Sequence, residues 1–153
     1  MSALVFVDTN VLLCEWDSSE AEKQKRSVEW LKALWSTRCG RTSFQVLAEF
    51  YVAATRKLSP PVEPERAQRY ARTLFSWEPV PTTAAVLEEA WLAQQRHRLS
   101  WWDSLIVSAA RTSGCRCLLS EDFQHGQVLA GLRVVSPFKA EPLDVLGPAA
   151  GVS

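Results

Sequence analysis

ALVFVDTN (residues 3–10) places an acid directly after five apolar residues. A short, continuous apolar run predicts a strand covered on both faces, as in the parallel sheets of α/β proteins. The acid, Asp8, has two interpretations on these residues alone. It caps a following helix, since the VLLCEW that comes next is compatible with a helix, or it belongs to a functional site at the end of the strand. Residues elsewhere in the chain are needed to choose between these two interpretations of Asp8.

Length and composition predict one folded domain without a membrane span. The chain has 153 residues, of which 47% are hydrophobic and 22% are charged, values typical of a globular domain. No apolar stretch approaches the roughly 20 residues that a membrane helix needs. The N-terminal run is too short for a signal peptide. We therefore expect a cytoplasmic protein.

The charges and the cysteines argue against several classes of site. Seventeen basic and seventeen acidic side chains cancel, so the net charge gives no warrant for nucleic-acid binding. The four cysteines are Cys14, Cys39, Cys115 and Cys117. Their one close pair is spaced C-x-C, without a nearby histidine, and this differs from zinc motifs. In a cytosolic chain we expect buried, reduced thiols rather than disulfides.

Strands and helices alternate along the chain, which predicts an α/β fold: a three-layer α/β/α sandwich with a mostly parallel central sheet. Expected helix caps are Ser18 or Ser19, Ser43, and Gly114 at a C-terminus. The expected strands lie in residues 3–7, 38–43, 78–82, 115–120 and 132–138, and the expected helices cover roughly 19–37, 43–57, 64–76, 83–98 and 101–114.

Two stretches are less regular than the rest. EPVPT (residues 78–82) contains two prolines, which confine any strand there to an edge or a terminus of the sheet. From about residue 139 the chain is rich in Pro, Ala and Gly. We therefore assign residues 1–138 to the domain and residues 139–153 to a loosely held C-terminal tail.

A second buried-strand candidate also ends in acid. CLLSED (residues 117–122) runs from apolar residues into Glu121 and Asp122. In an open parallel sheet, ligands bind in the crevice beyond the carboxyl ends of the strands. Asp8 and Asp122 are therefore expected at the same edge of the sheet.

Two further acids lie in otherwise apolar helices. Glu49 is in QVLAEFYV, and Asp103 follows two tryptophans in WWDSLIV. Each has a structural interpretation: Asp103 as a first-turn acid that the helix dipole favours, and Glu49 as a half-exposed residue at the border of the apolar stripe. The alternative is that all four acids converge on one site. Sequence spacing alone does not establish that convergence.

Four stretches, taken in order, resemble a known family. They are VDTN, the helix acid in QVLAEFYVAATRK, WWDSLIVSAA, and LLSEDFQHGQVLAGLRVVSPF. Together they look like a PIN-domain ribonuclease, and most closely like the VapC-like toxins of bacterial type II toxin–antitoxin pairs. The resemblance covers about residues 3–138 and implies a PIN-like fold. It puts the family's catalytic and metal-binding acids on Asp8, Glu49, Asp103 and Asp122, supported by Asn10 and Ser120.

The resemblance also implies an activity and partners. It predicts an Mg²⁺- or Mn²⁺-dependent endoribonuclease that uses a metal-activated water and leaves 5′-phosphate and 3′-hydroxyl ends. Two carboxylates about 5 Å apart repel by roughly 3 kcal/mol at an effective dielectric of 20, so four in one site need a cation. All-oxygen ligands suit Mg²⁺ or Mn²⁺ rather than zinc. The implied partners are RNA, a cognate antitoxin and a second copy in a homodimer.

The expected roles of the site residues follow from this chemistry. Asp8, Asp103 and Asp122 are expected to bind the metal directly, and Glu49 is expected to bind it through water or to act as general base. We expect Asn10 to orient Asp8. Ser120 is expected to hydrogen-bond an acid or a water at the metal. The substrate-binding residues are not identified.

Two other functions stay open. An aspartate-nucleophile phosphatase would form a phosphoryl-aspartate on Asp8, but it usually has a second acid two residues later, where this chain has Asn10. A non-catalytic RNA- or protein-binding scaffold would keep the fold with an idle metal site, and the retention of all four acids argues against it. Trp101 and Trp102 suggest base stacking, although core packing is expected for at least one. His125 is expected to be a loop residue.

Overall fold

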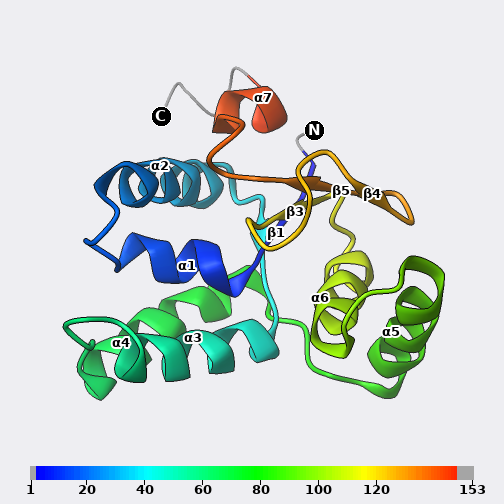
Figure 1. The fold of residues 1–153 in the computed structure, drawn as a ribbon, viewed down its shortest axis with the longest axis horizontal. Coiled ribbons are helices and arrows are strands. Elements are labelled where there is room, and N and C mark those ends of the chain that lie inside the picture. Colours follow the sequence, from blue (N-terminus) through cyan, green and yellow to red (C-terminus); the bar gives the residue numbers. More distant parts are fainter. Residues whose placement is uncertain (1–2, 148–153) are drawn as a thin grey trace.

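The computed structural model describes residues 3–147, and those residues form a five-stranded sheet flanked by helices (Figure 1). The strands are β1 (Val5–Val7), β2 (Gly40–Arg41), β3 (Cys117–Leu119), β4 (Val128–Leu129) and β5 (Leu132–Val135). The helices are α1 (Thr9–Glu15), α2 (Ala21–Thr37), α3 (Phe44–Arg56), α4 (Pro64–Thr73), the 3₁₀ helix η1 (Leu74–Trp77), α5 (Ala84–His97), α6 (Trp101–Thr112) and α7 (Pro142–Leu146).

The sheet confirms the predicted fold class. Its strand order is β2-β1-β3-β5-β4, and every neighbouring pair is parallel except β4 with β5. β1 lies between β2 and β3, with Val5 opposite Cys117 and Val7 opposite Leu119. In Figure 1, helices α1–α4 gather on one side of the sheet and the α5–α6 pair lies on the other. This is the α/β sandwich that the alternation of strands and helices predicts.

The central strand is apolar because both of its faces are covered. Val5, Phe6 and Val7 have no exposed surface, which explains why the run near the N-terminus does not alternate with polar residues. α3 contributes a buried stripe that includes Val46, Leu47 and Phe50. Packing on both faces leaves the carboxyl ends of β1 and β3 as the place where polar side chains emerge.

The structure corrects two local predictions. The N-cap of α2 is Glu20, without a side-chain cap bond, rather than Ser18 or Ser19. Ser19 is occupied elsewhere, because its backbone and hydroxyl both bond to Asp17. Residues 78–82 do not form a strand: Val80 makes only an isolated parallel bridge with Ser43. The two flanking prolines have no N–H to continue a ladder.

The hairpin of β4 and β5 was not predicted. Its turn is formed by Ala130 and Gly131, both with positive φ (51° and 86°). Two positive φ angles are typical of the tight hairpin turn that usually carries Asn-Gly or Asp-Gly. Alanine at the first position hides this signal in the sequence.

The start of the predicted tail is held against α2. Pro142–Leu146 form α7, in which Leu146 is buried. The indole N–H of Trp30 in α2 donates a 3.0 Å hydrogen bond to the carbonyl of Ala140. Residues 148–153 of the predicted tail lie outside the described residues, and the domain boundary at residue 138 stays a prediction.

The cysteines and the helix lengths can be compared with the predictions from composition. Cys39, Cys115 and Cys117 are buried, Cys14 is half-buried, and all four are free thiols, as expected for reduced side chains. Among residues 3–147, we find no helix with the length and apolar character that crossing a membrane requires.

Candidate active site

Asp8 lies at the junction of β1 and α1 and is buried, with 5% of the residue exposed. It caps α1, because its Oδ1 accepts a 2.8 Å hydrogen bond from the backbone N–H of Thr9. Its Oδ2 accepts hydrogen bonds from the Ser120 hydroxyl (2.8 Å) and from the side-chain amide of Asn10 (3.3 Å). The acid is therefore a helix cap, and it is also tied to the end of the neighbouring strand β3.

Burial raises the pKa of Asp8 from 3.8 to about 6. The hydrogen bonds from Ser120 and Thr9 lower this pKa, and the negative charges of Asp122 and Glu49 raise it. Acids that are far apart in the sequence thus act on one another electrostatically. A buried carboxylate in such surroundings favours either a proton or a nearby cation.

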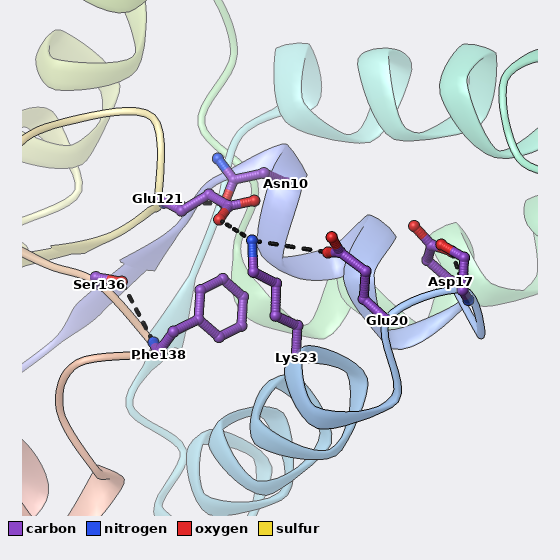
Figure 2. Close-up of polar contacts among 8 residues, drawn as sticks. Asn10, Asp17, Glu20, Lys23, Glu121, Ser136 and Phe138 are labelled. Carbon is purple, nitrogen blue, oxygen red and sulfur yellow. Dashed lines mark hydrogen bonds and ion pairs between the residues drawn. The ribbon is translucent and has the colours of Figure 1, made fainter.

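Ser120 and Asn10 join the ends of β1 and β3. Ser120, fully buried, accepts hydrogen bonds from the backbone N–H of Asp122 (3.1 Å) and from the Asn10 amide (3.0 Å). Asn10 Oδ1 accepts a bond from the backbone N–H of Glu121 (3.1 Å), and Figure 2 shows these two residues side by side. The hydrogen bonds expected of Ser120 and Asn10 to an acid are present. They fix residues 120–122 against the start of α1.

Glu49 is exposed on α3 and is connected to the start of α1. Its Oε2 accepts a 3.0 Å bond from the Thr9 hydroxyl, and its Oε1 accepts a 2.9 Å bond from the side-chain amide of Gln45. The helix that carries it begins as predicted, because the Ser43 hydroxyl accepts a bond from the backbone N–H of Val46. Thr9 therefore links Glu49 to Asp8, because its backbone N–H donates to Asp8 while its hydroxyl donates to Glu49.

Asp103 lies in the first turn of α6 and is partly buried. Its backbone N–H donates a 3.1 Å bond to the hydroxyl of Ser100, the N-cap. Burial raises the pKa of Asp103, the hydrogen bond with Ser100 lowers it, and the charges of Asp122 and Glu49 raise it. Its first-turn position agrees with the structural interpretation. The same two acids act on Asp8 and on Asp103.

A cleft of about 520 Å³ opens at this edge of the sheet. Glu49 and Asp122 both line it, from α3 and from the loop after β3. Asp8, which is buried, and Asp103, which is partly buried, do not line the cleft. The lining residues come from α1, α3, the residue after α3, and the loop after β3: Thr9, Asn10, Leu13, Ala48, Glu49, Val52, Ala53, Lys57 and Asp122.

The four acids fit a divalent cation in chemistry and charge. Carboxylate oxygens are the ligands that Mg²⁺ and Mn²⁺ prefer, and the repulsion that helps to raise the pKa of Asp8 and Asp103 is what a cation would relieve. The side chains do not yet form a coordination shell. Within the described part of the chain, no three His, Cys, Asp or Glu side chains are grouped so that they could hold an ion.

Sequence reasoning missed three residues of this site. Thr9 follows Asp8 directly, and Gln45 precedes Glu49 by four residues, the spacing of neighbours on a helix face, so both had a usable signal. Lys57 lies two helical turns beyond Glu49 and lines the same cleft. The helix predicted over residues 43–57 contains Lys57, but the sequence does not show how that helix lies against α1 and the loop after β3, which puts Lys57 in the cleft.

Trp101, Trp102 and His125 were also considered as functional residues from the sequence. Trp101 is partly buried against the core and stacks on Trp91, with 6.1 Å between ring centroids, which confirms that at least one of the two tryptophans packs there. Trp102 is 63% exposed. His125 is a loop residue, as expected, and its Nδ1 accepts a 3.0 Å bond from the backbone N–H of Ser136.

A comparison with protein-family models finds the PIN domain, matched over residues 5–128. The chain belongs to the PIN-domain family. The matched region of this PIN domain contains all four acids of the candidate site, together with Asn10 and Ser120. A search of curated proteins finds no match.

Several solved structures share this PIN-domain fold. The toxin–antitoxin complex from Klebsiella pneumoniae aligns with a TM-score of 0.62 and 18% identity, covering 89% of this chain and 99% of that one. FitAB bound to an IR36 DNA fragment aligns with a TM-score of 0.69 and 19% identity, covering 90% of this chain and 98% of that one. Mycobacterium tuberculosis VapC20, described as a sarcin–ricin loop cleaving toxin, aligns with a TM-score of 0.54 and 22% identity. The alignment covers 74% of this chain and 86% of that one. At these identities the likeness shows the fold alone.

Proposed function

We propose that this PIN-domain chain is a metal-dependent endoribonuclease, the toxin of a toxin–antitoxin pair that acts in the cytoplasm. The observation that carries the proposal is the buried Asp8, on which Asp122 and Glu49 act electrostatically beside a cleft that those two acids line. Membership in the PIN-domain family supports a nuclease. The fold shared with toxins of toxin–antitoxin pairs supports the toxin role.

The proposed cation is Mg²⁺ or Mn²⁺, held by Asp8, Asp103 and Asp122. Because these side chains do not form a shell as they stand, binding requires them to turn toward a common point. When bound, the cation supplies positive charge that activates a water and offsets the charge that builds on the phosphate.

The chain's own residues prepare this chemistry. Ser120 and Asn10 hold Oδ2 of Asp8, and the bond from Ser120 favours the anionic form of that carboxylate. Glu49 either binds through water or accepts the proton of the attacking water as general base. Its hydrogen bonds from Thr9 and Gln45 orient it along the wall of the cleft.

The proposed partners are RNA, an antitoxin and a second copy of the chain. The RNA would be single-stranded and cut to 5′-phosphate and 3′-hydroxyl ends. An antitoxin segment that covers the cleft would block it, and the similarity to structures of toxin–antitoxin complexes supports such a partner. Light scattering of the purified chain tests the homodimer.

RNA cleavage by purified protein tests the function. We expect tRNA, rRNA or mRNA to be cut internally when Mg²⁺ or Mn²⁺ is present and to stay intact in EDTA. Asp122→Asn should abolish cleavage because it removes one carboxylate from the cleft. Asp17→Asn is a matched control, since Asp17 bonds to Ser19 away from the cleft, and it should cut like the wild type.

The alternatives predict different outcomes. RNA that is bound but left intact with both metals would identify the non-catalytic scaffold, and hydrolysis of phosphate monoesters alone would identify the phosphatase. In cells, induced expression should arrest growth, and the arrest should vanish with Asp8→Asn and Asp122→Asn. Arrest that persists in both variants would contradict a nuclease toxin.

A further inference from the structure

We propose that Lys57 binds an RNA phosphate other than the one being cut, at the end of the cleft away from the acids. The inference rests on the proposed function and adds to it a substrate-binding residue. It also gives the RNA strand a path along the cleft, beside α3. The supporting observations are the position of Lys57, its lack of a partner, and the apolar wall between it and the acids.

The position of Lys57 follows from the geometry of α3. Glu49, Ala53 and Lys57 are spaced four residues apart, so they lie along one face of the helix, and all three line the cleft. Eight residues at 1.5 Å each separate the backbone of Glu49 from that of Lys57 by about 12 Å. Lys57 can therefore contact a phosphate other than the one at the acids.

The charge of Lys57 is available for a ligand. Lys57 is exposed, and its side chain has no ion pair or hydrogen bond with residues 3–147. Some other cations are engaged: Lys23 pairs with Glu121 at 3.1 Å (Figure 2), and Arg111 pairs with Glu89 at 3.1 Å. An unpaired ammonium in a cleft favours an anion, and phosphate contacts by lysine position a nucleic-acid strand.

The wall between the two ends of the cleft is apolar. Leu13, Val52 and Ala53 line it, and Val52 is 48% exposed although it is aliphatic. A nucleotide joins a charged phosphate to a base with an apolar face, which can pack on such a wall. The cleft therefore matches the alternation of charge and apolar surface along a single RNA strand.

Binding of a single-stranded, fluorescein-labelled oligouridylate tests this assignment. Anisotropy is measured in EDTA and in an Asp122→Asn background, which prevents cleavage and removes one like charge. In that background Lys57→Ala should weaken binding about fivefold or more. It should also reduce the slope of log Kd against log salt by about 0.7, the loss of one phosphate contact to a single strand.

Two variants serve as controls for this experiment. Lys57→Arg should retain binding, because it keeps the charge. Arg56→Ala removes the same charge from the neighbouring residue, which is exposed but does not line the cleft, and it should leave the affinity and the salt slope nearly unchanged. Thermal unfolding by circular dichroism confirms that each variant is folded.

The outcomes separate this inference from the proposed function. Equal effects of Lys57→Ala and Arg56→Ala, or no binding of the oligouridylate, would overturn the assignment of Lys57. Cleavage by the wild type with an unchanged KM in Lys57→Ala would overturn it too and leave the nuclease intact. Binding that depends on Lys57, by a wild type that leaves RNA uncut, would support the assignment and contradict the nuclease.

Discussion

The carboxylate of Asp8 serves structure and site at the same time. One of its oxygens caps α1, while the other accepts bonds from Ser120 and Asn10. These bonds keep the acid in place, but burial and the charges of two other acids raise its pKa. The Asp8 side chain is thus held in a fixed position, while its anionic form destabilises the fold. A bound cation would stabilise that anionic form.

The pH dependence of stability should reveal this cost. The folded protein binds the Asp8 proton more tightly than the unfolded chain, with a pKa of about 6 against 3.8. Stability from this group is therefore fully present below pH 3.8 and is lost as the pH rises through about 6. In EDTA, the unfolding free energy of Asp8→Asn minus that of the wild type should grow by about 2 kcal/mol from pH 4 to pH 7.

Urea unfolding at a series of pH values measures that difference. Asp122→Asn is the control, because Asp122 is exposed and contributes only a secondary effect to the pKa of Asp8. It should change the profile in the same direction by a smaller amount. A difference that stays flat, or that shrinks toward pH 7, would contradict a destabilising anion at Asp8.

At the scale of elements, the site is assembled by the pairing of β1 with its neighbours. β3 on one side brings Ser120 and Asp122, and β2 on the other leads into α3 and Glu49. β2 is only two residues long and depends on close packing. A Cβ added at Gly40 would lie 2.7 Å from the Cζ2 atom of the buried Trp77 ring, so glycine is required there.

Gly40→Ala should therefore destabilise the fold. Overpacking of a core site costs about 1–3 kcal/mol, and we expect a loss of that size in the free energy of unfolding in urea. The Trp77→Phe background provides the control, because a smaller ring leaves room for the added methyl group. Gly40→Ala should cost less in that background, and an equal cost in both would show that contact with Trp77 is not the cause.

Local signals explain which elements are predictable from the sequence. β1 and β3 are apolar runs, β5 is apolar apart from Arg133, and α3 begins at a capping serine, Ser43, followed by a helical stripe, so their types follow from composition and period. The Ala130–Gly131 hairpin lacks such a signal, because its turn uses an uncommon residue. The short helix α7 does carry local signals, a proline in its first turn and a capping box between Glu141 and Asp144, but they lie in a stretch whose overall composition predicts a loose tail.

The candidate site is predictable only in part for a similar reason. Motifs identify the four acids and their supporting residues Asn10 and Ser120. The spacing of those motifs does not reveal that Glu49 bonds to Thr9, or that Asp103 stands outside the cleft. These are consequences of how α1, α3 and α6 are placed around the sheet, and no local pattern encodes that placement.

On the scale of the whole molecule, a formal net charge of zero hides an uneven distribution. Acids from the end of β1, from α3 and α6, and from the loop after β3 act on one another at the carboxyl edge of a mostly parallel sheet, where ligands of such sheets bind. Among the described residues, the cations with ion pairs lie outside the cleft: Lys23 and Arg26 on α2, Arg41 on β2 and Arg111 on α6. The four acids therefore concentrate negative charge at this edge, which a proton on Asp8 or a bound cation would reduce.

Calorimetric titration of the purified protein with Mn²⁺ near neutral pH tests this account most directly. We predict saturable binding by the wild type, equal binding by Asp17→Asn, and affinity lower by at least about tenfold in Asp8→Asn and in Asp122→Asn, since each removes a carboxylate from the site. A wild-type protein that does not bind Mn²⁺, or binding that is unchanged in both site variants, would contradict the proposal that these acids share one cation.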